Sequence, residues 1–123
     1  MHEATLVLGI LDAAREAVEE HRAAHPEEKA LRIQEIECEL GLIASVEAQT
    51  LTACFELFAE GTMAQGATLS LRTRPLDCEC SACGHAFALT QRRFACPNCG
   101  SEEIHFNGGH GLTLVSLRVE SEE

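Results

Sequence analysis

Between residues 3 and 22, apolar side chains recur every three or four positions, which is the period of an α-helix with one buried face. The stripe consists of Val7, Ile10, Leu11, Ala14, Ala17 and Val18. Charged residues such as Arg15 and Glu19 lie mostly outside the stripe. Because Pro26 cannot continue a helix, we expect this one to end within the acidic, histidine-containing segment 19–26.

Alternation of apolar and polar residues predicts three strands. Residues 31–40 alternate with one slip of phase near the middle, which indicates a bulge. Residues 67–73 also alternate, and Pro75 stops them. The third strand is the segment 112–119, which is rich in Leu and Val.

A second helix is predicted between the first two strands. We expect Ser45 to cap its N-terminus, with Glu47 in the first turn, and Gly61 to follow its C-terminus. Its apolar face is expected to contain Leu51, Cys54, Phe55 and Phe58, spaced i, i+3, i+4 and i+7. The predicted fold class is therefore α+β, with two helices packed on a three-stranded sheet.

Two Cys-x-x-Cys pairs stand out in the second half of the chain. Cys80 and Cys83 form the first pair, Cys96 and Cys99 form the second, and twelve residues separate the pairs. Each pair can direct two sulfurs at one ion, and this spacing is typical of zinc-ribbon or knuckle sites with four thiolates. Four thiolates also bind iron, so a rubredoxin-like redox protein is an alternative.

The cysteine pairs divide the expected architecture into two domains. We expect a zinc-binding module, residues 76–107, to be inserted between the second and third strands. Residues 1–75 and 108–123 would then form the α/β domain that contains both helices. At 123 residues and 13.3 kDa, the chain has room for one such domain and a small metal-stabilised module.

The charge of the chain bears on its partners. The formal net charge is −11, and clustered Lys and Arg are rare. This disfavours a zinc-ribbon protein that binds nucleic acid or acts as a regulator, because phosphate binding requires basic clusters. The pair Arg92-Arg93 is the basic cluster between the knuckles, and we expect it to be solvated.

The remaining cysteines and histidines have weaker signals. Seven cysteines, without a signal peptide or a long apolar run, indicate a reducing, cytoplasmic location. Cys38 and Cys54 are expected to be small buried side chains. Cys78 could compete with Cys80 as a ligand, and His85 is either an exposed loop residue or an exchangeable ligand. We assign no role to the other inner histidines, His21, His25, His105 and His110.

The first three residues, Met1-His2-Glu3, offer a second candidate metal site. A free α-amine, the backbone nitrogen of residue 2 and the His2 imidazole can close adjoining chelate rings on one ion. Nitrogen donors in a plane suit Ni²⁺ or Cu²⁺. On its own this tripeptide is a weak signal, because chain termini are usually disordered.

Several short motifs, in this order along the chain, resemble one family. They are Met1-His2-Glu3, Glu39-Leu40-Gly41, Val46-Glu47, Phe55-Glu56-Leu57, Gly61-Thr62 and the two cysteine pairs. Together they are similar to the HypA/HybF family, the nickel metallochaperones of [NiFe]-hydrogenase maturation, some of which also serve urease. The resemblance covers essentially the whole chain.

The resemblance implies specific metal ligands and partners. Nickel, as transported cargo, would be bound by the Met1 amine, by His2 through its imidazole and backbone, and by Glu3 through its backbone amide or side chain. The four paired cysteines would hold structural zinc. A HypB-type GTPase and the hydrogenase large-subunit precursor would be the partners. No catalytic nucleophile, paired carboxylate or phosphate loop is evident in the sequence, so we expect no enzymatic activity.

Overall fold

The apolar stripe near the N-terminus forms helix α1, Glu3–Ala24. The computed structural model describes residues 3–28 and 31–121, and the chain divides into two compact units. The first, here called the sheet unit, is drawn from Met1–Glu39, Val46–Arg72 and Leu112–Glu123. The second, the cysteine unit, comprises Leu40–Ser45 and Thr73–Gly111.

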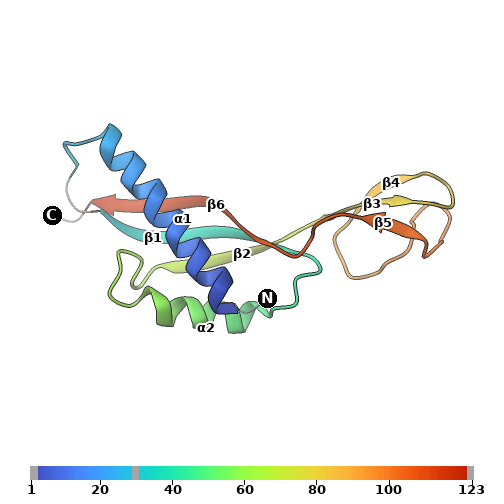
Figure 1. The fold of residues 1–123 in the computed structure, drawn as a ribbon, viewed down its shortest axis with the longest axis horizontal. Helices are drawn as coiled ribbons and strands as arrows, with labels where there is room; N and C mark the ends of the chain where they lie inside the picture. The colour runs from blue at the N-terminus through green and yellow to red at the C-terminus, as the bar shows by residue number, and fades with distance from the viewer. Residues whose placement is uncertain (1–2, 29–30, 122–123) are drawn as a thin grey trace. The chain divides into compact units, whose positions relative to one another are not determined.

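The sheet unit contains the two helices and the three strands expected from periodicity. Strand β1 spans Leu31–Gly41, helix α2 Ala48–Ala59, β2 Thr68–Arg74 and β6 Leu112–Ser121. The strands lie in the order β2-β1-β6. Figure 1 shows α1 lying across the strands, where it contacts both β6 and α2. The predicted α+β class, with two helices on a three-stranded sheet, is confirmed.

The core of the sheet unit is aliphatic with one large aromatic side chain. The fully or nearly buried residues are Val7, Ile10, Ala14 and Val18 of α1, Leu31, Ile33, Ile36 and Cys38 of β1, Leu51, Phe55 and Ala59 of α2, and Ala64 between α2 and β2. Each large side chain removed from water contributes about 1.5–3 kcal/mol. In β1, Ile33 and Ile36 are both buried while the two residues between them are half-buried, which is the predicted slip of phase.

Helix α2 differs from the prediction at its start and on its buried face. Its N-cap is Glu47, which makes no side-chain capping bond, rather than Ser45. The reason is that Ser45 belongs to a segment that folds with the cysteine unit. The buried face follows i, i+4 and i+8 around Phe55, so that Phe58 is 38% exposed. Gly61 follows the helix with φ of 78°, as expected of the residue after a C-cap.

The cysteine unit contains a second three-stranded sheet that alternation in the sequence did not predict. Strands β3 (Leu76–Cys80), β4 (Ala86–Leu89) and β5 (Ile104–Phe106) lie in the order β4-β3-β5, with both pairs antiparallel. A small apolar core holds this sheet. It consists of Leu42, Leu76 and Cys78, packed by Ile43, Phe87, Leu89 and Ile104.

The segment Leu40–Ser45, which connects β1 to α2, is part of the cysteine unit. Besides the apolar contacts of Leu42, two backbone hydrogen bonds attach it: Gly41 donates to the Gly111 carbonyl (2.8 Å) and Ile43 to the Gly109 carbonyl (3.0 Å). The backbones approach so closely that a Cβ on Gly41 would lie 2.2 Å from the Gly109 oxygen. Glycine is therefore required at position 41.

Arg92 and Arg93 are both exposed, as expected, but Arg92 also binds the backbone of the segment between β1 and α2. Its Nε donates to the Leu42 carbonyl (2.9 Å), and one terminal nitrogen donates to the Ala44 carbonyl (2.8 Å). The partners are backbone oxygens about fifty residues away in sequence, which explains why no local pattern indicated them. Among the described residues, no helix has both the length and the apolarity required to cross a membrane.

Candidate metal centre

The two knuckles bring four thiols together at the end of β3. The Sγ atoms of Cys80, Cys83, Cys96 and Cys99 all lie within 4.8 Å of one another. Cys80 is 3.6 Å from Cys99, and Cys83 is 3.7 Å from Cys96. Four sulfurs about 2.3 Å from a tetrahedral ion stand about 3.8 Å apart. The thiols are therefore positioned to hold a metal ion such as zinc.

The same backbone turn is built twice. In each Cys-x-x-Cys turn the backbone carbonyl of the first cysteine accepts a hydrogen bond from the amide of the glycine four residues later. Gly84 donates to Cys80 and Gly100 donates to Cys96, both at 2.8 Å. Both glycines have positive φ, 77° and 79°, which side chains disfavour. The amide of each first cysteine also donates to the carbonyl five residues ahead. These repeated bonds hold both cysteine pairs in the same backbone turn, and the four sulfurs lie within 4.8 Å of one another.

The pKa values of two exposed thiols in the cluster are shifted in opposite directions, that of Cys83 downwards and that of Cys99 upwards. The Asn98 side chain, which donates to the Cys83 sulfur at 3.6 Å, is the main cause that lowers the pKa of Cys83 to about 6. The backbone amide of Ser101 favours the Cys99 thiolate. Even so, the neighbouring Cys80 thiol, desolvation and the other two cysteines raise the pKa of Cys99 to about 12. Metal binding must therefore displace the proton from Cys99, while Cys83 is ready to bind near neutral pH.

Asn98 is a contributor that the sequence did not reveal. It stands inside the second knuckle, Cys96-Pro97-Asn98-Cys99, where a side-chain amide can reach across to a sulfur of the first pair. The signal available was the amide within a Cys-x-x-Cys turn, but the spacing alone does not show which thiol it faces.

The other candidate ligands lie outside the four-thiol cluster. Cys78 is buried against Leu42 and Leu76, and its thiol donates to the Leu76 carbonyl at 3.4 Å. Desolvation first, and then Asp77, raise the pKa of Cys78. His85 stacks on Phe87, with ring centroids 5.9 Å apart. Neither residue contributes a donor to the group of four.

Cys38 and Cys54 differ in their burial. Cys38 is fully buried in β1, and desolvation followed by the charge of Glu37 raises its pKa to about 11. Cys54 is only half-buried on α2. The expectation of a small buried side chain is thus confirmed for Cys38 and only partly met by Cys54.

Of the predicted nickel ligands, Glu3 is the one that belongs to the described residues. Met1 and His2 fall outside the described residues. Glu3 is the first residue of α1 and is half-buried. A carboxylate in the first helical turn interacts favourably with the positive end of the helix dipole.

Comparison with known proteins places the chain in a family. A family profile described as hydrogenase/urease nickel incorporation, metallochaperone, hypA, matches residues 1–119. The hydrogenase maturation factor HybF of Morganella morganii is 33% identical over 120 residues, which cover 98% of this chain and 100% of the relative. The hydrogenase maturation factor HypA of Azotobacter chroococcum mcd 1 is 35% identical with the same coverage.

Solved structures agree on the fold. The solution structure of the Ni metallochaperone HypA from Helicobacter pylori matches with a TM-score of 0.59 at 22% identity, over 99% of this chain and 100% of that one. A second solution structure of a HypA protein gives a TM-score of 0.65, also at 22% identity, over 99% and 98% of the two chains. The matched profile and the relatives above 30% identity show that this chain belongs to the HypA/HybF family of hydrogenase maturation factors.

Proposed function

We propose that this protein is a nickel carrier that binds Ni²⁺ at its N-terminus and delivers it during [NiFe]-hydrogenase maturation, with urease as an alternative client. The observation that carries the proposal is the family match from residue 1 to residue 119. Met1, His2 and Glu3 would bind the ion through the terminal amine, the His2 imidazole and backbone nitrogen, and the amide or carboxylate of Glu3. Such nitrogen donors suit the planar coordination that Ni²⁺ accepts.

The geometry of the cysteine cluster supports a structural role for zinc at this site and a separate site for the nickel cargo. The four thiols lie within 4.8 Å of one another, and as ligands they would fill the coordination sphere of a tetrahedral zinc ion and leave no open position, as in structural zinc sites. A carrier must exchange its cargo, so the cargo belongs at a more open site. We assign structural zinc to Cys80, Cys83, Cys96 and Cys99.

The zinc ion would stabilise a unit that has little else to hold it. Only Leu42, Leu76 and Cys78 are buried in the small core that supports the β3 sheet. Metal binding energy then becomes folding energy for this unit. Removing zinc with a strong chelator should lower the stability of the cysteine unit, so that its amides exchange faster with solvent, while the helices of the sheet unit keep their protection.

The family match supports a proposal for the partners and the location. A HypB-type GTPase and the precursor of the hydrogenase large subunit would receive or exchange nickel with this protein in the cytoplasm. The acidic surface, with a net charge of −11, favours cations and basic partner surfaces over nucleic acid. The protein would act without catalytic activity of its own.

Nickel titration tests the proposal directly. We expect untagged, zinc-loaded protein to bind Ni²⁺ at the N-terminus, the variant H2A to lose that site, and an uncleaved N-terminal tag to have the same effect. H105A is the matched control, because His105 is an exposed histidine of β5. Equal stoichiometry and affinity in wild type and H2A would refute the assignment. Iron instead of zinc in the purified protein would favour the redox alternative.

Nickel binding at this site should also weaken as the pH falls. The amine, amide and imidazole nitrogens must all be deprotonated to bind the ion. Affinity measured between pH 6 and 8 should therefore decrease towards the acidic end.

A further inference from the structure

Two histidines and a glutamate meet at the C-terminal end of α1. His21 and His25 are spaced i, i+4, so they share one face of the helix. Their rings stack with centroids 4.4 Å apart and 20° between the planes. The turn after the helix, in which the Glu28 amide donates to the His25 carbonyl at 3.1 Å, brings Glu28 back to the same place. There its Oε2 lies 2.8 Å from the His21 Nε2.

We infer that His21, His25 and Glu28 form a second, exchangeable site for a divalent transition ion such as Ni²⁺. Imidazole and carboxylate are common donors for this class of ion. The site is separate from the N-terminal site proposed above and does not rest on it.

The separation of the first two donors fits this chemistry. Two ligand atoms about 2.1 Å from one ion and at right angles to each other stand about 3 Å apart. The His21 nitrogen and the Glu28 oxygen are already 2.8 Å apart. An ion can therefore replace the proton between them with little movement of either side chain.

The hydrogen bond of His25 presents its other nitrogen to an ion. His25 donates from Nδ1 to the backbone carbonyl of His21 at 3.0 Å. In the neutral ring this leaves Nε2 with a free lone pair, and histidine ligands commonly donate their second nitrogen to a carbonyl in this way. Among the described residues only the four cysteines are already gathered as a group of three or more donors, so the His25 ring must tilt out of the stacked arrangement to share an ion with His21. Because His25 is exposed, it has room to do so.

The surroundings of the three residues favour a cation. The C-terminal end of a helix carries the negative end of its dipole. Acidic residues outnumber basic residues near the site in the sequence: the acidic ones are Glu19, Glu20 and Glu27, and the basic ones are Arg22 and Lys29. The local charge thus favours a divalent ion before any coordination bond forms.

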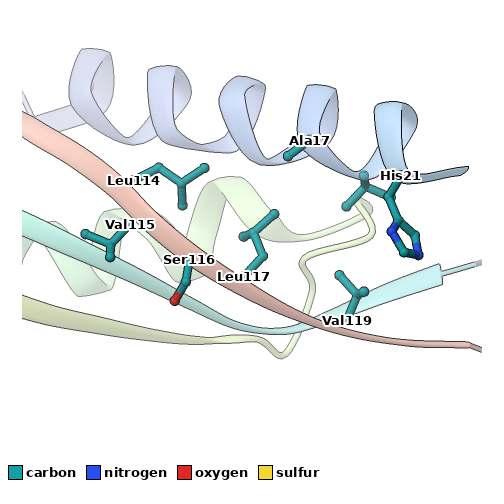
Figure 2. A pocket seen from close by; sticks show the side chains of 8 residues that line it. Ala17, His21, Leu114, Val115, Ser116, Leu117 and Val119 are labelled. Atoms are coloured by element: carbon teal, nitrogen blue, oxygen red, sulfur yellow. The ribbon is translucent and has the colours of Figure 1, made fainter. Parts of the chain in front are cut away.

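Open space beside His21 lets its ring adjust. A pocket of about 330 Å³ lies between α1 and β6, and His21 is its one titratable lining residue. Figure 2 shows the imidazole projecting from α1 on the side of the sheet, near Val119. The other described residues of the lining are apolar apart from Ser116, so His21 is the imidazole donor that they place at this space.

The test uses zinc-loaded, untagged full-length protein in the H2A background, titrated with Ni²⁺ alone by calorimetry at pH 7.5. We expect the H2A protein to retain one weak nickel site. H2A/H21Q and H2A/H25Q should each bind at that site at least tenfold more weakly, and H2A/E28Q should also bind more weakly. H2A/H105Q is the matched control and should bind as H2A does.

A second readout locates the ion. Substoichiometric Ni²⁺ should broaden the ring signals of His21 and His25 before those of His105 and His110 in nuclear magnetic resonance spectra. The inference is overturned if H2A binds no nickel, if the His21 and His25 variants bind like H2A, or if broadening starts at the other histidines. A comparison of wild type with H2A tests the N-terminal site separately, so failure of either proposal can be told from failure of the other.

Discussion

Replacing Gly41 with alanine should disrupt the attachment of the Leu40–Ser45 segment within the cysteine unit. An added Cβ would lie 2.2 Å from the Gly109 oxygen, 2.4 Å from the Gly109 carbonyl carbon and 2.9 Å from the His110 nitrogen. All three are backbone atoms, so no side-chain rotation can relieve the overlap. The two backbone segments must move apart by about 1 Å to reach ordinary van der Waals contact.

This movement lowers the free energy of unfolding because it breaks backbone hydrogen bonds. The bonds from Gly41 to the Gly111 carbonyl and from Ile43 to the Gly109 carbonyl would both be lost or weakened. Each is worth about 1 kcal/mol, and forcing extra atoms into packed structure costs about 1–3 kcal/mol more. We therefore expect G41A to destabilise this part of the cysteine unit by about 3–5 kcal/mol.

Amide hydrogen exchange on zinc-loaded protein measures the effect locally. A factor of ten in exchange rate corresponds to about 1.4 kcal/mol, so exchange at the amides of residue 41 and Ile43 should accelerate by roughly two to three and a half orders of magnitude. Amides in the middle of α1 should keep their protection. The chain has no Trp or Tyr, so exchange followed by mass spectrometry is better suited than intrinsic fluorescence.

Gly9 provides the matched control. It lies within α1, and nothing stands within 4 Å of an added Cβ. Because alanine is a better helix former than glycine by about 1 kcal/mol, G9A should stabilise the sheet unit slightly. Unchanged protection at positions 41 and 43 in G41A, or the same response to both substitutions, would refute the steric reasoning.

Two further predictions concern the core and the thiols. F55A should lower the free energy of unfolding by about 3–5 kcal/mol, because Phe55 is 1% exposed, whereas F58A should cost about 1 kcal/mol or less at a position that is 38% exposed. Denaturant unfolding followed by far-ultraviolet circular dichroism measures both, and equal losses would contradict the observed face of α2. In zinc-free protein, alkylation of Cys83 should rise with pH through about 6 as its thiolate forms, while Cys99, with a pKa of about 12, should react slowly at neutral pH. N98A should move the Cys83 profile to higher pH, and a profile that does not move would show that Asn98 is not the cause.

Periodicity predicted the sheet unit well because each of its elements buries one face. The stripe from Val7 to Val18 and the phase slip of β1 are both visible in the sequence and both present in the structure. On α2, periodicity predicts Cys54 and Phe58 on the buried face, whereas the structure leaves Cys54 half-buried and Phe58 38% exposed. Leu51, Phe55 and Ala59 are buried, and alanine contributed too little hydrophobic signal to compete with Phe58.

The cysteine unit was less predictable because metal-site spacing, rather than periodicity, dominates its sequence. The four thiols could be grouped from the sequence, and the structure brings them within 4.8 Å of one another. Strands β3, β4 and β5 are three to five residues long, which is too short for alternation to be read. Contacts such as those of Arg92 depend on distant backbone atoms, so only the folded chain reveals them.

The bonds of Arg92 to the Leu40–Ser45 segment have a consequence for dissecting this protein. Cutting out residues 76–107 as one insert would remove Arg92 together with Leu76 and Cys78, and the apolar side chains of Leu42 and Ile43 would lose the core in which they are packed. The shortened protein would expose apolar side chains in the loop between β1 and α2, and these would promote self-association. A soluble sheet unit therefore requires polar replacements at positions 42 and 43. An isolated cysteine unit requires the segment Leu40–Ser45 to be supplied as a separate peptide.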